Sequence, residues 1–269
     1  MLNQSNKQKI ITALKNKTFV KIISGIQNYD KKKSLEVAMA SELGGATALD
    51  ICDDPEIIKP LRALVQLPIF VSSVDPLKLV AASSFGVDVL EIGNYESFYK
   101  EGKLFTPNEI LEITKFVKKS LSVGTNGHLP LLCCTVPATL EVKNQIKLAK
   151  ELINLGVDIL QTESFEGDIP ASDRKDKTYI DILKASSTLA NTIELRKEFP
   201  NAYIITASGI TPTTLPIALS VGSNGVGIGT YINSLFTQEE MTEKVKEIME
   251  IVNHVPVQKE IAQSFALKI

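Results

Sequence analysis

The sequence has few of the residues on which several classes of protein depend. Its 269 residues include three cysteines, two histidines and no tryptophan. Three cysteines do not form the disulfide framework of a small secreted domain, and two histidines without a cysteine cluster argue against a zinc site. No apolar run reaches the ~20 residues that a membrane-spanning helix needs. The formal net charge is only −2, so we expect no partnership with nucleic acid or with a membrane.

The first residues also lack the features of a targeting segment. Residues 1–17 contain no arginine and no apolar core followed by a cleavage site. Ile10, Ile11 and Leu14 instead fall on one helical face. We therefore predict a short N-terminal helix that caps one end of the fold.

A seven-residue sequence motif that occurs twice indicates the fold class. FGVDVLE at residues 85–91 returns as LGVDILQ at residues 155–161, and looser copies lie at residues 43–50 and 221–229. Each copy has a glycine where an apolar helical stretch ends, which suits the left-handed residue that closes a helix. The apolar run that follows is typical of a buried parallel strand. The two close copies start about 70 residues apart, roughly two strand–helix units, which predicts a (β/α)8 barrel.

Helix start signals between the apolar runs complete this pattern. Asp54-Pro55 and Asp75-Pro76 each provide an N-cap followed by proline, and residues 106–109 form a capping box. We predict an α/β fold, a TIM barrel that occupies residues 1–269 as a single domain. The expected strands are residues 19–24, 47–52, 69–73, 87–92, 131–136, 159–163, 203–208 and 225–229. The expected helices span or begin at residues 32–43, 54, 75, 106, 141–154, 179–197, 214 and 239–253.

Glycines after the last two predicted strands indicate a phosphate site. Many barrels of this class hold a ligand phosphate in the loops after strands 7 and 8. We expect the backbone N–H groups of Gly209, Ile210, Gly229 and Thr230 to donate to it, with Ser208 binding substrate beside them. The alternative is that these glycines only permit tight turns. They make a poor dinucleotide fingerprint, because no acidic residue follows in a matching strand–helix–strand unit.

Charged and polar residues interrupt several of the apolar strands. Lys21, Asp50, Glu91 and Glu163 lie in the middle or C-terminal half of their strands, and Gln161 shares a face with Glu163. A charge there is costly unless it is paired or faces a site. We predict that these side chains meet in the upper barrel, with Lys21, Asp50, Glu91 and Glu163 catalytic and Gln161 binding substrate.

Other interpretations of the same residues stay open. The charges could form a buried ion-pair network without chemistry. A Schiff base at Lys21 is a weaker interpretation, because neighbouring carboxylates would keep its ammonium charged. We predict no metal ligands, although magnesium held by Asp50, Glu91 or Glu163 stays open, and the sequence does not identify a cofactor.

Several residues have a structural explanation. Asp53 and Asp54 are expected to cap a helix, and Asp88 and Asp158 to act at the entrance of their strands. Cys133 and Cys134 face opposite sides of a strand, and His128 lies at the wrong end of that strand to serve as a base. Core packing is therefore the better interpretation of both cysteines.

Two predicted loops at the C-terminal face are long. They span residues 93–105, which are rich in aromatic residues, and residues 164–177, which are polar and charged. Each is either a lid over a site or a surface insertion.

Seven motifs in order resemble a known family, the hypothetical chloroplast reading frame twenty-three family of algal plastids and cyanobacteria. The resemblance covers residues 20–232 and implies a TIM-type barrel and a location in the plastid stroma. The family has no established activity, so it assigns no catalytic residues. The motifs are Lys21–Asp30, Asp50–Pro55, Glu91–Asn94, Thr135–Pro137, Gln161–Glu163, Ala207–Gly209 and Gly225–Gly229.

These observations favour a barrel enzyme that acts on a phosphorylated small molecule by acid–base chemistry of isomerase, lyase or synthase type. One alternative is a non-catalytic metabolite-binding or regulatory protein that uses the same phosphate site. Another is an FMN-dependent oxidoreductase, because a flavin phosphate fits the same loops. The sequence does not distinguish a monomer from a homo-oligomer.

Overall fold

Eight parallel strands form a closed barrel in the computed structural model, in the order β1 to β8 with β8 returning to β1. The structure describes residues 2–99, 101–124, 129–165 and 176–254. Each strand is found within two residues of its predicted bounds, so the predicted TIM barrel is confirmed. The strands are β1 Phe19–Ile23, β2 Ala48–Ile51, β3 Ile69–Ser73, β4 Val89–Ile92, β5 Leu131–Val136, β6 Ile159–Thr162, β7 Tyr203–Ala207 and β8 Gly225–Ile228.

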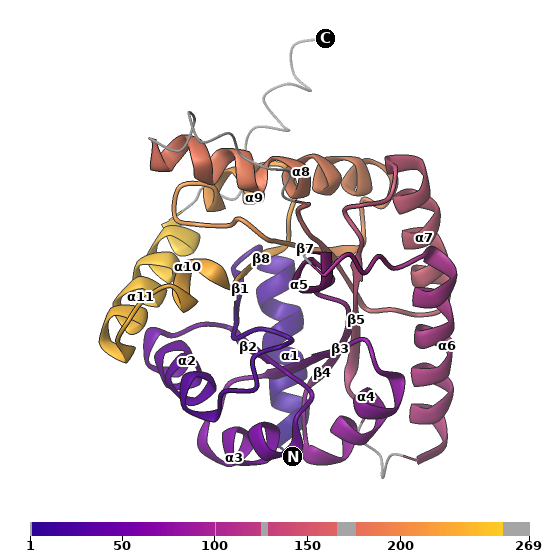
Figure 1. The fold of residues 1–269 in the computed structure, drawn as a ribbon, viewed down its shortest axis with the longest axis horizontal. Helices are drawn as coiled ribbons and strands as arrows, with labels where there is room; N and C mark the ends of the chain where they lie inside the picture. Colours follow the sequence, from indigo (N-terminus) through magenta and orange to yellow (C-terminus); the bar gives the residue numbers. More distant parts are fainter. Residues whose placement is uncertain (1, 100, 125–128, 166–175, 255–269) are drawn as a thin grey trace.

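Helices surround these strands, as Figure 1 shows. The described chain also contains two short helices that the pattern did not predict, α5 after β4 and α10 after β8. In that same part of the chain, no helix combines the length and apolar character needed to cross a membrane. The helices are α1 Leu2–Asn16, α2 Lys31–Gly44, α3 Pro55–Leu64, α4 Pro76–Ala82, α5 Glu96–Tyr99, α6 Pro107–Gly124, α7 Val142–Asn154, α8 Lys177–Glu198, α9 Leu215–Ser220, α10 Thr230–Asn233 and α11 Gln238–His254, with a 3₁₀ turn η1 at Ser83–Phe85.

Local signals in the sequence set the ends of these helices. The carboxylate of Asp54 accepts a hydrogen bond from the N–H of Glu56 and begins α3, and Asp75 begins α4 in the same way. The glycines of the repeated motif, Gly86 and Gly156, have φ of 75° and 81°. That left-handed conformation strains other residues, so the helix-ending role of both glycines is confirmed.

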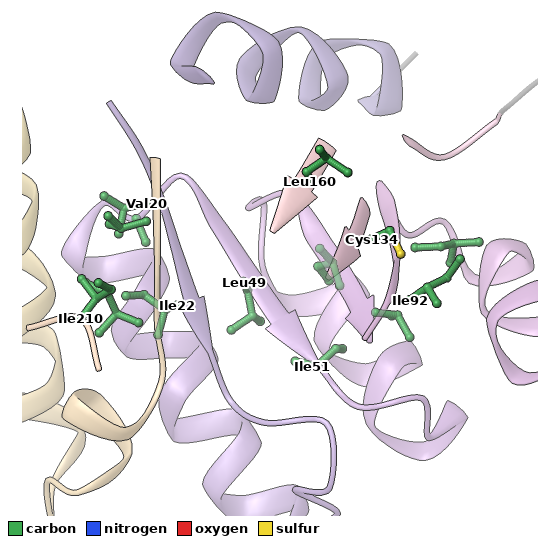
Figure 2. Close-up of a cluster of buried hydrophobic side chains, with 14 of the residues drawn as sticks. Val20, Ile22, Leu49, Ile51, Ile92, Cys134, Leu160 and Ile210 are labelled. Atoms are coloured by element: carbon green, nitrogen blue, oxygen red, sulfur yellow. The ribbon is translucent and has the colours of Figure 1, made fainter. Parts of the chain in front are cut away.

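Apolar side chains fill two layers, one outside and one inside the barrel. Figure 2 shows outward-facing side chains of the strands, among them Val20, Ile22, Leu49 and Ile51, in the outer cluster. This cluster lies between strands and helices, as expected when both faces of a parallel sheet are buried. The inner cluster fills the lower lumen and includes Ile10 and Leu14 of α1, Phe19, Ala48, Phe70, Val89, Leu131, Cys133, Ile159 and Ile205. The predicted capping helix is thus confirmed.

Aspartates at the starts of two strands hold the lower end of the barrel together. Asp88 Oδ2 accepts from the backbone N–H of Ile69 at 2.9 Å and from Arg62 at 3.0 Å. Asp158 Oδ2 accepts from the N–H of Leu132 at 2.8 Å. The structural role expected for both carboxylates is confirmed, and function must be sought at the other end.

Candidate functional site

Directly above the apolar layer, the lumen changes to polar residues. Side chains alternate along a strand, so the inward position two residues after Phe19 is Lys21, and the one after Ala48 is Asp50. The same step on the other strands brings in Ser72, Glu91, Thr135 and Gln161, and all six side chains are buried. We call these six residues the polar layer. Pairing of Lys21 with Gly227 closes the ring at this level.

The polar layer is a connected network around one lysine. Lys21 Nζ forms ion pairs with Asp50 Oδ2 at 3.1 Å and with Glu91 Oε2. Glu91 Oε1 in turn accepts from Gln161 Nε2 at 2.6 Å, and Asp50 Oδ1 accepts from Ser72 Oγ at 2.6 Å. The predicted meeting is therefore confirmed for Lys21, Asp50, Glu91 and Gln161. For Glu163 the prediction is wrong, because its hydrogen-bond partners in the described structure lie outside this network.

Electrostatics keep the lysine of this layer charged. Burial alone would lower the pKa of Lys21, but the carboxylates of Asp50 and Glu91 outweigh burial and raise that pKa above its ordinary value. Burial raises the pKa of Glu91, and Lys21 opposes that shift. A charged ammonium is not a nucleophile, so the geometry does not favour a Schiff base at Lys21.

A cavity of about 580 Å³ opens above the polar layer, at the C-terminal ends of the strands. The predicted phosphate-binding residues Gly209, Ile210, Gly229 and Thr230 all line it, as do Ser208 and Glu163. In the described part of the chain, Lys21, Asp50, Glu91 and Gln161 are not among the lining residues. Four of the predicted site residues therefore lie one layer beneath the cavity.

Asn94 connects the polar layer to the cavity. Its Nδ2 donates to Asp50 Oδ2 at 3.0 Å and to Ser72 Oγ at 2.8 Å, and its Oδ1 accepts from Gln161 at 2.7 Å. Asn94 also lines the cavity. Sequence reasoning missed this residue, although the Gly93-Asn94 step directly after a strand was a signal. Its φ of 64° is one that asparagine tolerates better than most residues.

Glu163 is bonded to a different set of residues from those of the polar layer. It accepts from the hydroxyl of Tyr99, from the N–H of Glu96 at 3.1 Å and from the N–H of Ala138 at 3.4 Å. Burial raises the pKa of Glu163 to about 8, although the bond from Tyr99 acts in the opposite direction. Within the described residues it forms no bond to Lys21 or Glu91, because it lies at the end of β6, above the polar layer.

The loops after β7 and β8 expose backbone donors to the cavity. Ser208 and Gly209 both have φ of 68°, and a Cβ on Gly209 would lie 2.6 Å from the backbone of Lys184, so close packing against α8 requires that glycine. Among the described residues, the N–H groups of Gly209, Ile210, Gly229 and Thr230 have no hydrogen-bond acceptor. The sequence did not single out the cavity's three lysines, Lys177, Lys184 and Lys244.

Other predictions about single residues had mixed outcomes. Asp54 caps α3, but the prediction that Asp53 also caps it is wrong, because Asp53 accepts from Ser73 Oγ at 2.5 Å and from Lys78 Nζ at 3.0 Å. Cys133 faces the lumen and Cys134 the outer cluster, which confirms core packing. No group of three or more potential metal ligands occurs within the ranges that the structure describes.

The structure describes most of the first of the two long loops but little of the second. Residues 93–105 contain α5, whose Tyr99 and Glu96 contact Glu163 beside the cavity. Tyr95 is buried against Phe105, with ring centroids 4.6 Å apart. This loop therefore forms part of the cavity wall, and its role as a lid stays a prediction. Most of the second loop, residues 166–175, lies outside the described residues.

Comparison with known families assigns the chain to one of them. A family model described as "Protein of unknown function (DUF561)" matches residues 4–258. The chain belongs to this family. Relatives of the DUF561 chain named "Uncharacterized protein ycf23" include one from Pyropia yezoensis, 37% identical over 251 residues that cover 91% of this chain and 86% of the relative. Another from Cyanidium caldarium is 34% identical over 249 residues, which cover 92% of this chain and 96% of the relative. Ycf23 is hypothetical chloroplast reading frame twenty-three, so the resemblance is confirmed.

Solved structures similar to this chain include TIM-barrel enzymes. KGPDC from Streptococcus mutans matches with a TM-score of 0.60 at 10% identity, over 88% of this chain and 98% of its own. Thiamine phosphate pyrophosphorylase from Pyrococcus furiosus matches with a TM-score of 0.55 at 18% identity, over 90% of this chain and 99% of its own. At such low identity these likenesses support the fold alone.

Proposed function

We propose that this protein is an enzyme that binds a phosphorylated small molecule at the C-terminal mouth of its barrel and carries out acid–base chemistry of isomerase, lyase or synthase type. The observation that carries the proposal is the placing of backbone donors and a carboxyl group with a raised pKa around one cavity. Backbone N–H groups of glycine-rich loops can bind phosphate oxygens, and a carboxyl group with a pKa near neutrality suits proton transfer.

The cavity residues divide this work between binding and proton transfer. Gly209, Ile210, Gly229 and Thr230 would donate to the phosphate, and Ser208 would bind the substrate beside them. Glu163 would act as general acid or base, because it alone of the four expected catalytic residues lines the cavity in the described part of the chain.

The polar layer would act from beneath. Lys21, Asp50 and Glu91 were expected to be catalytic, but in the described structure they are connected to the cavity through Asn94. Asn94 bonds to Asp50 directly and to Glu91 through Gln161 and Thr135. We therefore propose that they hold Asn94 in place and set the electrostatic potential below the substrate, rather than touch it. The alternative without chemistry, a purely structural ion-pair network, gives the same contacts and is separated from this proposal by the variants described below.

A glycine variant tests the phosphate site directly. Gly229 has room for a side chain, since an added Cβ would have no neighbour closer than 3.5 Å. Gly229→Asp would place a carboxylate among the donors and repel phosphate. Inorganic phosphate at 100 times its dissociation constant should add about 2.7 kcal/mol to the stability of the unaltered protein in a thermal-shift assay. This stabilisation should disappear in Gly229→Asp.

Ser84→Asp is the matched control. It adds the same charge at an exposed position within η1, which precedes β4 at the end of the barrel away from the cavity. The control should keep the full stabilisation by phosphate. Equal stabilisation of both variants, or none of the unaltered protein, would refute the phosphate site. Binding of phosphorylated metabolites without turnover would instead support the non-catalytic alternative.

We also propose the plastid stroma as the location of the protein, because its relatives share the name of a chloroplast reading frame. Fractionation of cells with an antibody against the chain tests this. Recovery outside the plastid fraction would contradict it.

A further inference from the structure

The cavity has two opposite walls with different charges. In a closed ring of eight strands, β4 and β8 are four strands apart and face each other across the mouth. The proposed phosphate donors stand at the β7 and β8 wall. Asn94 and Glu96 stand at the β4 wall, and Glu163 follows β6, between the two. A ligand whose phosphate lies at one wall extends its other end toward Asn94 and Glu163.

Cations gather near the phosphate wall. Lys177 lies with its Nζ 5.7 Å from the ring centre of Tyr231, which follows the first residue of α10. The backbone of Lys184 packs on Gly209, and Lys244 acts electrostatically on Tyr231. All three lysines line the cavity, where they outnumber the one acidic residue of this side, Asp181, among the described lining residues. Asp181 accepts from Thr211 Oγ1 at 3.2 Å, and Lys244 also pairs with Glu247 at 2.6 Å. The three lysines suit a dianionic phosphate, which needs cations as well as backbone donors.

Within the described residues, the opposite wall offers no cation to a ligand. The described lining residues from β4, α5 and the end of β6 are Asn94, Glu96, Ser97 and Glu163, and none of them is basic. The amide hydrogens of Asn94 are already donated to Asp50 and Ser72. Beneath this wall, Lys21 stands against two carboxylates. The raised pKa of Glu163 agrees with surroundings that do not favour negative charge.

From this asymmetry we infer that the ligand is a phosphate ester whose other end is uncharged and carries hydroxyl or carbonyl groups, and that a carboxylate at that end is rejected. A hydroxyl can donate to ionised Glu163, and a carbonyl can accept from its protonated form. A carboxylate would lose its hydration and gain the single Ser97 hydroxyl as a donor, but no cation from the described lining residues. This inference rests on the proposed function, because it takes the phosphate to lie at the β7 and β8 loops.

Two matched compounds test the inference. D-Glucitol 6-phosphate and 6-phosphogluconate have the same carbon chain and phosphate, and differ only in a terminal CH2OH or carboxylate. Their dissociation constants are measured by isothermal titration calorimetry, beside that of inorganic phosphate. The glucitol ester should bind about tenfold more tightly than the gluconate ester, the cost of a buried charge left without a partner.

A single lysine should narrow this preference. Ser97 is exposed and lines the wall that lacks cations, so Ser97→Lys should tighten binding of the gluconate ester and reduce the ratio about threefold or more. Ser84→Lys, which adds the same charge away from the cavity, should leave the ratio unchanged.

The outcomes separate this inference from the proposed function. If both esters and inorganic phosphate bind and Gly229→Asp abolishes all three, but the two esters bind equally, the phosphate site stands and the inference is wrong. Tighter binding of the gluconate ester, or a ratio unaltered by Ser97→Lys, also overturns it. If neither ester nor phosphate binds, the proposed function and the inference are both wrong.

Discussion

The polar layer and the cavity above it contain similar residues, but they differ in how completely those residues are satisfied. In the layer, the cation of Lys21 contacts two carboxylates, and these accept further bonds from Ser72, Thr135 and Gln161. At the cavity, backbone donors lack partners within the described chain, and Glu163 carries a raised pKa. Among the described residues of the layer, one buried polar atom, Gln161 Oε1, lacks a partner. Extensive hydrogen bonding favours rigidity, whereas unsatisfied groups favour binding and proton transfer. The comparison suggests that the layer supports the site and that the cavity is the site.

The largest expected effect comes from breaking the layer. Lys21→Met replaces the lysine by an uncharged side chain of similar length, and it leaves Asp50 and Glu91 buried without their cation. Breaking a buried ion pair in this way should lower the free energy of unfolding by about 3–5 kcal/mol. Urea denaturation followed by circular dichroism measures the loss.

Two variants control for this result. Lys115→Met breaks an exposed pair with Glu112 and should cost less than about 1 kcal/mol. Lys21→Met combined with Glu91→Gln removes one of the stranded charges and should recover part of the loss. A cost for Lys21→Met as small as that for Lys115→Met would mean that the layer is not the rigid support described here.

A second prediction concerns pH and belongs to the cavity. The pKa of Glu163 is raised by burial to about 8 from an ordinary value of 4.5, so between these values the folded protein holds a proton that the unfolded chain releases. The unfolded state then binds fewer protons, and the stability should fall as pH rises through this window, by about 1.4 kcal/mol per pH unit at most. Above pH 8 this contribution is constant.

Glu163→Gln provides the comparison for the pH effect. Glutamine keeps one acceptor oxygen for the N–H of Glu96 and turns an amide N–H toward the Tyr99 hydroxyl, which can accept it, but glutamine does not titrate. The free energy of unfolding of both proteins is measured from pH 5 to pH 9, and their difference isolates Glu163. Parallel curves across that range would show that the carboxyl group is not held neutral, and would remove the main support for its role in proton transfer.

Much of the fold could be predicted because its signals are local. Glycines that close helices and aspartates that begin them act within one turn of the chain, as Gly86 and Asp54 show. Alternation with period two also placed Lys21 and Gln161 inside the barrel. It placed Glu163 on the same face as Gln161, but one step higher. Which layer a residue occupies depends on the stagger of the strands, and local sequence does not contain that information.

The missed residues depend on arrangement in space. Lys177, Lys184 and Lys244 lie on helices α8 and α11, and their sequence surroundings resemble those of any exposed lysine. Only the packing of α8 on the β7 loop and of α11 beside α10 directs them to the cavity. Asp53 shows the opposite error, because a local explanation was available and the actual partners, Ser73 and Lys78, come from another strand and helix.

The smallest predicted effect tests whether the layer and the cavity act together through Asn94. Asn94→Gly removes the amide that Asp50, Ser72 and Gln161 share, and glycine adopts a φ of 64° without strain. Leaving those groups short of a partner should cost about 1–3 kcal/mol. The raised pKa of Glu163, read from the pH dependence described above, should stay unchanged, because Asn94 makes no bond to Glu163 in the described structure.

Lys17→Gly is the matched control, because Lys17 also has a positive φ, of 58°, at the end of α1 and far from the cavity. It reports what glycine does to the backbone alone, which should be less than about 1 kcal/mol. Equal costs for the two variants would mean that the Asn94 side chain contributes nothing, and the layer would then be structural without influence on the cavity. A larger cost for Asn94→Gly, accompanied by weaker binding of the two phosphate esters but not of inorganic phosphate, would place the coupling at the wall that faces the far end of the ligand.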